Sequence, residues 1–128
     1  MSSIAGQVPA RALTEAERAA LDFVLSVNDP RVMPLREQAG AARVVWECTC
    51  GCATINFEVD RAAGRPAIGL CSAAIQTYRR LPYEINEFCE LLLFLEDGWL
   101  SSLELVWYQT VIATFPRPDE FEPPQLRC

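Results

Sequence analysis

Histidine and lysine are both absent from this 128-residue sequence, and its eleven basic residues are all arginine. Without histidine, the chain has no Ser-His or Cys-His nucleophile pair and no H-E-x-x-H metal site. Without lysine, it has neither a Walker phosphate-binding loop nor the amine that Schiff-base chemistry requires. The two absences exclude the usual serine and cysteine hydrolases, the zinc proteases and the P-loop nucleotide-binding proteins.

An excess of positive charge is missing as well. The formal net charge is −6, whereas nucleic acid and anionic membranes are recognised by clustered cations. We therefore expect neither nucleic acid nor a membrane as partner. A basic protein partner is compatible with this charge.

Long apolar runs are also missing. The longest purely apolar run around the second hairpin described below is Leu91 to Leu95, whereas a membrane-spanning helix needs about 20 residues. Residues 1–6 contain neither the basic nor the apolar region of a signal peptide. The sequence thus predicts a cytoplasmic protein, whose cysteines remain thiols and form no disulfide framework.

Length and composition indicate a single domain over residues 1–128. Apolar residues make up 51% and charged residues 22% of the chain, which is ordinary for a folded globular protein. We expect residues 1–12 to be poorly ordered. Residues 115–128 are expected to form an extended, proline-rich tail with Phe115 and Phe121 as its anchors. The prolines between residues 115 and 124 prevent that part from continuing a sheet.

Two helices are predicted in the N-terminal third. Thr14 is a good N-cap residue, and Glu17 three positions later completes a capping box. Apolar residues then recur at helical spacing as far as Asn28-Asp29-Pro30, where the helix ends. A short second helix is predicted from Pro34 to Ala39, with Gly40 as its C-terminal cap.

From Arg43 the apolar residues alternate with a period of two, which predicts a β-hairpin. We expect Cys50 and Gly51 to form a two-residue turn, so that one face of the hairpin is buried. The expected cross-strand pairs are Trp46 with Ile55, Val44 with Phe57, and Arg43 with Glu58.

Asp97-Gly98 lies between two apolar segments and predicts a second hairpin, from Phe88 to Tyr108. A tight turn there divides the apolar residues between the two faces of the hairpin, and both faces are mostly apolar. Strands of this kind are either central strands that are covered on both sides or strands whose second face meets a partner. The expected faces are Phe88, Leu92, Phe94, Leu103, Leu105 and Trp107 on one side, and Leu91, Leu93, Leu95, Leu100 and Val106 on the other. With a weaker strand at residues 74–80, the predicted fold class is α+β: one or two N-terminal helices packed on a mainly antiparallel sheet of about five strands.

Cys48, Cys50 and Cys52 fall within five residues. A structural zinc site needs four tetrahedral ligands, and without histidine the fourth has to be Cys71, Cys89, Cys128 or a carboxylate. The two-residue turn, however, points Cys48 to the core and Cys52 to the opposite face, so the thiols do not converge.

Two other interpretations of these cysteines stand beside the metal site. A redox role lacks both a C-x-x-C pair and a lysine or histidine to lower a thiol pKa. The interpretation that we prefer from the sequence makes Cys48, Cys71 and Cys89 small buried hydrophobes, while Cys50 and Cys52 shape the turn. Because a wider turn would gather the thiols, the register of the hairpin decides between these alternatives.

Glu104 follows Ser101-Ser102-Leu103 in the most apolar strand of the chain. A buried carboxyl there would have a raised pKa and act as an acid or base. We favour a β-bulge at Ser101-Ser102, or an edge position of the strand, that turns Glu104 towards solvent. The candidate interaction or pocket residues are Trp99, Glu104, Trp107 and Tyr108.

Two segments carry a resemblance: Cys48-Thr49-Cys50-Gly51-Cys52-Ala53-Thr54-Ile55 and Leu93 to Glu104, which is followed by Trp107-Tyr108. They resemble a group of small uncharacterised proteins from high-GC actinobacteria that combine a C-x-C-G-C turn with a D-G-x-L-S-S-L-E hairpin. The resemblance covers about a quarter of the chain. It implies that the two hairpins define the fold together, and it assigns no activity to any residue.

The sequence therefore predicts a small, acidic, non-enzymatic protein without a cofactor that binds another protein, or itself, through apolar sheet surface. The first alternative is a cysteine-ligated zinc-binding domain that uses Cys48, Cys50, Cys52 and Cys71. The second is a carboxylate-dependent enzyme for small molecules, which requires Glu104 and another acid to line one pocket.

Overall fold

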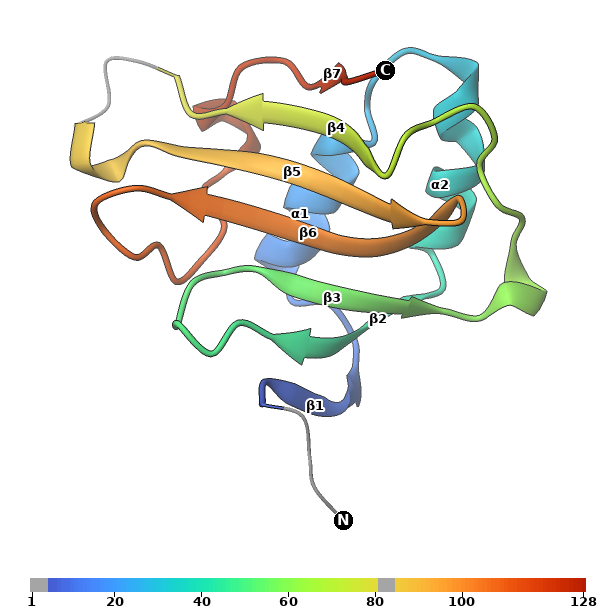
Figure 1. Ribbon diagram of the computed structural model, residues 1–128, viewed down its shortest axis with the longest axis horizontal. Coiled ribbons are helices and arrows are strands. Elements are labelled where there is room, and N and C mark those ends of the chain that lie inside the picture. Colours follow the sequence, from blue (N-terminus) through green and yellow to red (C-terminus); the bar gives the residue numbers. More distant parts are fainter. Residues whose placement is uncertain (1–4, 81–84) are drawn as a thin grey trace.

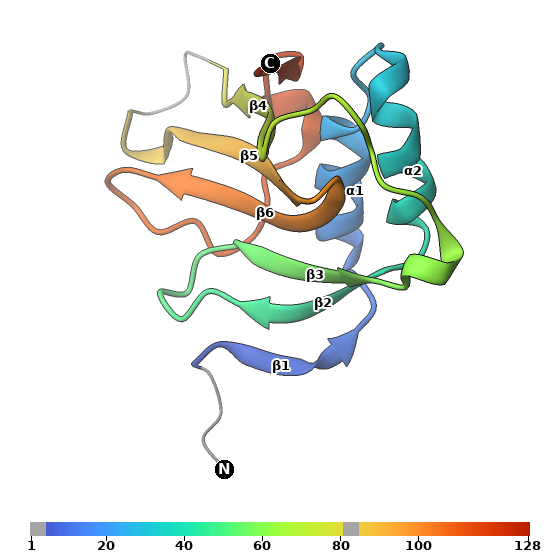
Figure 2. The same cartoon turned by 45° about the vertical axis from the view of Figure 1, so that its right-hand side comes forward.

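A computed structural model describes residues 5–80 and 85–128 of the chain. Seven strands form one antiparallel sheet in the order β1-β2-β3-β6-β5-β4-β7, and the helices α1 and α2 cover one of its faces (Figures 1 and 2). The strands are β1 (Gln7–Arg11), β2 (Ala42–Glu47), β3 (Ile55–Val59), β4 (Ala73–Tyr78), β5 (Cys89–Glu96), β6 (Trp99–Trp107) and β7 (Gln125–Leu126). The helices are α1 (Glu15–Val24) and α2 (Met33–Ala39), with short 3₁₀ turns at Pro30–Val32, Arg61–Ala63, Ile85–Glu87 and Pro118–Glu120.

The α+β class and the two helices are confirmed. The predicted capping box is present, because the Thr14 hydroxyl accepts from Glu17 N at 3.2 Å while Thr14 N donates to Glu17 Oε1 at 2.8 Å. Helix α1 ends at Val24, earlier than the predicted stop at Asn28. Helix α2 ends before Gly40, as predicted.

The sheet has seven strands, so the prediction of about five is too low. The two additional strands are short edge strands that lie in segments for which we expected little regular structure. Gln7–Arg11 pairs with β2, although residues 1–12 were expected to be poorly ordered; residues 1–4 of that range lie outside the described residues. Phe121 forms an antiparallel bridge with Arg79, so the expectation that residues 115–124 cannot continue the sheet is wrong at this residue. Gln125–Leu126, beyond the last proline of the tail, pairs with β4. Phe115 and Phe121 are both buried, which confirms them as anchors.

The core lies between the helices and the sheet. Its fully buried side chains come from both layers, and burying one such aliphatic group contributes roughly 1.5–3 kcal/mol. They include Leu21, Val24, Val32 and Leu35 on the helical side, and Ile75, Leu91, Leu93, Leu103 and Leu105 on the sheet.

The β5–β6 hairpin turns at Asp97-Gly98 as predicted, and both residues have positive φ (52° and 83°). Its expected division into faces is wrong, because Ser101 is an extra residue between the pairs Leu95–Leu100 and Phe94–Ser102. One inserted residue moves every following side chain to the other face. The core face therefore combines Leu91, Leu93 and Leu95 with Leu103 and Leu105.

Gln38 on α2 is a buried polar link between the helical layer and this hairpin. Its Nε2 donates to Arg65 O at 2.8 Å and to Gly98 O at 3.0 Å, and its Oε1 accepts from Leu100 N at 2.8 Å. The side chain has no exposed area. Because its amide nitrogen and oxygen are both paired, these hydrogen bonds offset the cost of burying the amide, and the side chain fixes the hairpin end against α2.

A disulfide joins Cys71, just before β4, to Cys128, just after β7. The expectation that all cysteines remain thiols is therefore wrong for this pair. The bond closes a loop with a sequence separation of 57 residues. By chain-entropy arguments such a closure stabilises the fold by roughly 4 kcal/mol.

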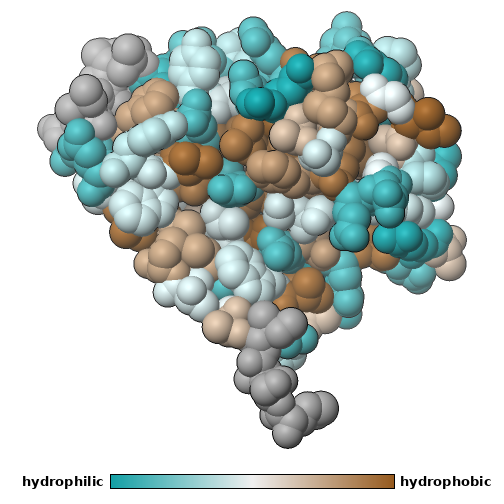
Figure 3. Space-filling model, in the orientation of Figure 1, coloured by the Kyte–Doolittle hydropathy of each residue, from teal (hydrophilic) through white to brown (hydrophobic). Residues whose placement is uncertain are grey.

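The face of the sheet away from the helices is open, and apolar and polar side chains are mixed on it (Figure 3). Leu92 lies opposite Glu104, and Phe94 lies opposite Ser102. None of the described helices is long and apolar enough to cross a membrane. The turn that carries the three clustered cysteines lies at one end of this sheet, between β2 and β3.

Candidate functional site

The β2–β3 hairpin differs in register from its prediction at one residue. Arg43 pairs with Glu58 and Val44 with Phe57, as predicted, but Trp46 pairs with Asn56 instead of Ile55. Val45 is the additional residue that shifts the pairing. From this bulge onward the β2 side chains exchange faces. Trp46 consequently lies on the open face of the sheet and not in the core.

The connection between β2 and β3 is a wide turn, so the prediction of a two-residue turn at Cys50-Gly51 is wrong. Cys48 N donates to Thr54 O at 3.1 Å, and Gly51 N donates to Cys48 O at 3.3 Å. Gly51 has a φ of 92°, a conformation that favours glycine. Ala53 N donates to Ile112 O at 2.9 Å and so attaches the turn to the segment that follows β6.

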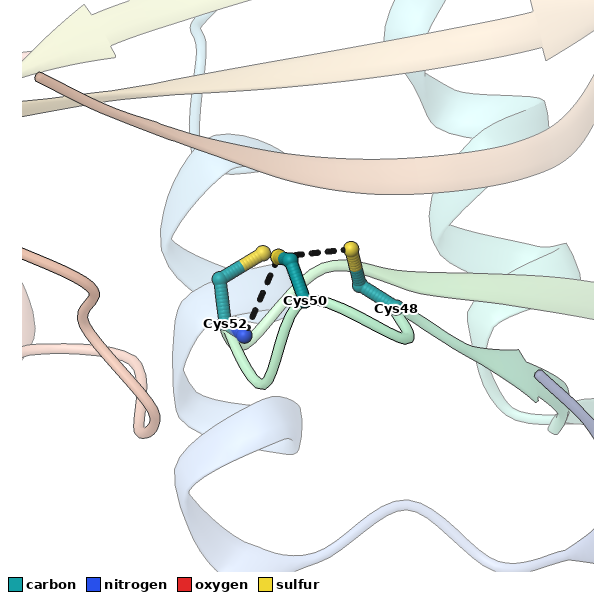
Figure 4. Close-up of side chains that lie close together, drawn as sticks. All are labelled: Cys48, Cys50 and Cys52. Atoms are coloured by element: carbon teal, nitrogen blue, oxygen red, sulfur yellow. Dashed lines mark hydrogen bonds between the residues drawn. The ribbon is translucent and has the colours of Figure 1, made fainter.

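Cys48, Cys50 and Cys52 converge on one side of this turn, contrary to the prediction that they scatter. Their sulfur atoms all lie within 4.8 Å of one another. Figure 4 shows the three side chains pointing to the same side, with the Cys50 sulfur near both others. The Cys48 and Cys50 sulfurs are 2.8 Å apart, and Cys52 N donates to the Cys50 sulfur at 3.4 Å. The prediction that Cys48 is buried in the core is also wrong, because its side chain is only partly covered.

The contact between Cys48 and Cys50 separates the pKa values of their thiols. The hydrogen bond with Cys50, aided by burial, raises the pKa of Cys48 to about 11. The same hydrogen bond, together with the backbone N–H of Cys52, lowers the pKa of Cys50 to about 7. Cys50 therefore carries the first negative charge of the pair near neutral pH.

A groove of about 420 Å³ adjoins the three thiols on the open face of the sheet. The indole rings of Trp46 and Trp107 take part in its walls, and its polar side chains come from neighbouring strands and the turn. Its further lining residues are Thr54, Asn56, Ser102, Glu104, Leu105 and Val106. Among the described residues that line it, Glu104 is the single carboxylate. The groove therefore does not supply the second acid that a carboxylate enzyme would need.

Thr54 fixes the far end of the turn to β6. Its hydroxyl accepts from Leu105 N at 2.9 Å and lies 3.3 Å from Leu105 O and 3.4 Å from the Cys52 sulfur. These contacts replace a backbone ladder between the turn and β6. Sequence reasoning gave Thr54 no role, because the contact depends on which strand becomes the neighbour of β3.

The other predicted site residues fall in different places. The bulge at Ser101 is confirmed, and it turns Glu104 to the groove, where its side chain is half-buried. Trp107 lines the same groove. Tyr108 is exposed and donates its hydroxyl to Glu90 Oε2 at 2.6 Å. Trp99 is buried, with the Arg61 guanidinium 5.2 Å from its ring centre, and so lies outside this site.

The remaining cysteines are separate from the cluster. Cys71 is exposed and bonded to Cys128, so its predicted roles as a fourth metal ligand and as a buried hydrophobe are both wrong. Cys89 is completely buried, as predicted. Burial raises the pKa of the Cys89 thiol to about 11, which keeps it protonated and unreactive.

A larger cavity of about 630 Å³ lies between the start of α1 and residues 113–118. Small side chains form much of its lining, among them Ala16, Ala19, Ala53 and Ala113. Glu17, which also lines it, is paired with Arg11 at 2.8 Å. The three thiols lie instead at the turn between β2 and β3, residues 48–54, which is called the thiol turn below. Because thiols can bind metal ions or react, this turn is the better candidate site.

Comparison with known proteins assigns nothing to this chain: no protein-family model matches it, and no curated protein or solved structure matches it significantly. The functional argument therefore rests on the geometry of the thiol turn and the groove beside it. Three sulfur donors at one point are a ligand set for thiophilic metal ions and also a reactive thiol cluster.

Proposed function

We propose that the turn at residues 48–54 binds a thiophilic metal ion, Zn²⁺ or Cu⁺, through the thiolates of Cys48, Cys50 and Cys52. The observation that carries this proposal is the convergence of the three sulfurs within 4.8 Å. Thiolates select zinc, copper(I) and related soft ions over magnesium and calcium. The argument against a metal site from the sequence was the scattering of the thiols, and the bulge at Val45 removes it.

The sulfur positions are close to those that a metal ion requires. With Zn–S bonds of about 2.3 Å, tetrahedral coordination places two sulfurs about 3.8 Å apart. The separation of 2.8 Å between Cys48 and Cys50 must therefore widen by about 1 Å on binding. Cys50 is exposed, and beside it a Cβ added at Gly51 would meet no atom within 4 Å, so the tip of the turn has room for this movement.

Three protein thiolates leave one position of a tetrahedral ion open. Since Cys71 is bonded to Cys128, it does not complete the site. The groove that the three cysteines line also contains Glu104, the carboxylate of its described lining. A site with three protein ligands and an exchangeable fourth is typical of metals that react or are handed on, whereas structural zinc is usually held by four.

Metal binding is tested on protein purified without a histidine tag. We expect one Zn²⁺ per chain by elemental analysis, and a thiolate-to-cobalt charge-transfer band when Co²⁺ replaces it. Cys50→Ser should weaken Zn²⁺ binding by more than about 100-fold, since even changes outside the ligand shell cost 10–100-fold. Cys89→Ala removes a thiol from the core and serves as the matched control with unchanged affinity. Absence of stoichiometric metal, or equal affinity of the two variants, would contradict the proposal.

A second function, protein binding through the open face, is favoured by an aromatic cluster at one end of the sheet. Phe88 lies between Tyr78 and Tyr108, at ring separations of 6.3 and 5.6 Å. Both tyrosines are about half exposed, and aromatic residues of this kind are enriched at protein interfaces. Because Glu90 adjoins the cluster and the chain carries a net charge of −6, we propose a basic protein partner.

Self-association is the competing outcome for this face, and sedimentation velocity over a concentration series distinguishes the two. A monomer at every concentration that binds a basic test protein, with the loss of that binding in Tyr108→Ser, supports a heterologous partner. A dimer that Tyr108→Ser dissociates contradicts it.

The cellular compartment stays a prediction. The cytoplasm is the compartment expected from the sequence, whereas a disulfide such as Cys71–Cys128 is more typical of oxidising compartments. Non-reducing electrophoresis of protein alkylated during cell lysis measures whether this bond is present in its own cell.

A further inference from the structure

The three thiols of the turn are not equivalent, and one pair is singled out. The Cys48 and Cys50 sulfurs are 2.8 Å apart, closer than an ordinary contact between two sulfur atoms. The Cys52 sulfur instead donates to the Thr54 hydroxyl at 3.4 Å, and Thr54 is itself fixed to Leu105. The Cys48 and Cys50 sulfurs are thus in direct contact, and the Cys52 sulfur lies within 4.8 Å of both.

We propose that Cys48 and Cys50 form a thiol–disulfide exchange pair whose substrate is a low-molecular-weight disulfide. We further propose that their oxidation switches off the metal site, a part that rests on the function proposed above. The chain length between the two residues permits the bond: Cα atoms two positions apart lie within about 7 Å of each other, and disulfides span roughly 4.4–6.8 Å.

The exposure of the two thiols determines which of them reacts first with the external disulfide. Cys50 is the exposed sulfur of the cluster, whereas Cys48 is partly covered. Cys50 therefore meets the external disulfide first. The groove beside it, with the side chains of Trp46 and Trp107 in its lining, has room for the organic group that the disulfide carries.

The exchange balances without another reagent. The Cys50 sulfur, as thiolate, attacks one sulfur of the external disulfide, whose S–S bond breaks and releases one thiolate that takes up a proton. Cys48 then loses its proton and attacks the Cys50 sulfur of the mixed disulfide, displacing the second external thiol. Two protein thiols are oxidised to one disulfide, and one external disulfide is reduced to two thiols.

The exchange is tested on the metal-free full-length protein in glutathione buffers of increasing oxidised fraction. After acid quenching and alkylation, peptide mass spectrometry should show a Cys48–Cys50 disulfide, with Cys52 alkylated and no lasting glutathione adduct. A persistent adduct on wild-type Cys50, a bond between Cys50 and Cys52, or no reaction at the turn would overturn the proposal.

Three serine variants assign the roles. Cys48→Ser should trap glutathione on Cys50, because the resolving thiol is gone. Cys50→Ser should remove the exchange, and Cys52→Ser should leave it intact. Circular dichroism confirms folding of each variant, and rapid disulfide formation in Cys50→Ser would contradict the assigned order.

Metal measurements then separate this proposal from the preceding one. The reduced protein should bind Zn²⁺, and the oxidised protein should bind it more than about 100-fold more weakly, because two ligands are gone. If the reduced protein exchanges disulfides but binds no metal, the proposed function fails and the exchange pair stands. If the oxidised and reduced proteins bind metal equally, the coupling of the two is wrong.

Discussion

The turns of the two hairpins in this protein differ in how closely other parts of the chain pack against them. In β5–β6 the turn is packed: a Cβ added to Gly98 would lie 2.3 Å from Ala67 O. In β2–β3 the turn is open, and a Cβ added to Gly51 would meet nothing within 4 Å. The packed turn is part of the fold's stability, whereas the open turn leaves its side chains available for chemistry.

The largest expected effect comes from filling the packed turn. Gly98→Ala combines a positive φ of 83° with a clash against backbone, so we expect a loss of about 3 kcal/mol in unfolding free energy. Gly51→Ala is the matched control, with a φ of 92° but open space, and should lose only about 1 kcal/mol. Urea denaturation of both variants measures the difference. Equal losses would show that packing does not distinguish the turns.

A smaller effect is expected from the polar link behind the packed turn. Gln38→Met keeps the size of the side chain but removes the acceptor of Leu100 N and the donor to Arg65 O, while Gly98 O keeps its hydrogen bond from Ala67 N. We expect a loss of about 2 kcal/mol, the usual cost of unsatisfied buried groups. Glu37→Gln, at an exposed position of the same helix, should stay within about 0.5 kcal/mol of wild type. If the Gln38→Met variant is as stable as wild type in urea denaturation, the hairpin does not depend on this link.

The smallest effect concerns the charges that hold the open hairpin. Arg11 bridges Glu17 at 2.8 Å and Glu47, the last residue of β2, at 3.0 Å. Burial alone would raise the pKa of Glu17, but hydrogen bonds from Arg11 and Thr14 outweigh it, and the net pKa is lowered. A lowered folded pKa means that stabilisation is complete above the unfolded pKa and is lost as the pH falls through the folded one.

Glu17→Gln should therefore destabilise the protein by about 1 kcal/mol at pH 7. The difference from wild type should shrink as the pH falls through the lowered pKa of Glu17, because wild-type Glu17 then also becomes neutral. Thermal unfolding of both proteins between neutral and acidic pH measures this convergence. A difference that stays constant with pH would mean that the charge of Glu17 does not contribute.

Local chemistry predicted the parts of the fold in which a few neighbouring residues determine the geometry. The capping box of Thr14 and Glu17 and the Asp97-Gly98 turn depend on residues within four positions of one another, and both are confirmed. The edge strands β1 and β7 were missed, because each has few residues and depends on a partner far away in the chain.

The candidate site was mispredicted for one physical reason. A perfect alternation from Val44 onward places Cys48 in the core, and the bulge at Val45 reverses that placement. Nothing in the residue types around Val45 marks a bulge, since it has neither glycine nor proline beside it. The bulge at Ser101 is present as predicted. It could be predicted because Glu104, a charged residue in an apolar strand, indicated that the alternation must break.

The cysteines differ in exposure, so the rate at which each is labelled can report unfolding of the protein. The turn holds three thiols that are exposed or partly covered, Cys89 is completely buried, and Cys71 and Cys128 are bonded to each other. A thiol-labelling reagent added to the native, metal-free protein should therefore react in two phases, the turn thiols first and Cys89 only when the core opens. The slow phase reports how often whole molecules unfold, while the fast phase reports the state of the site.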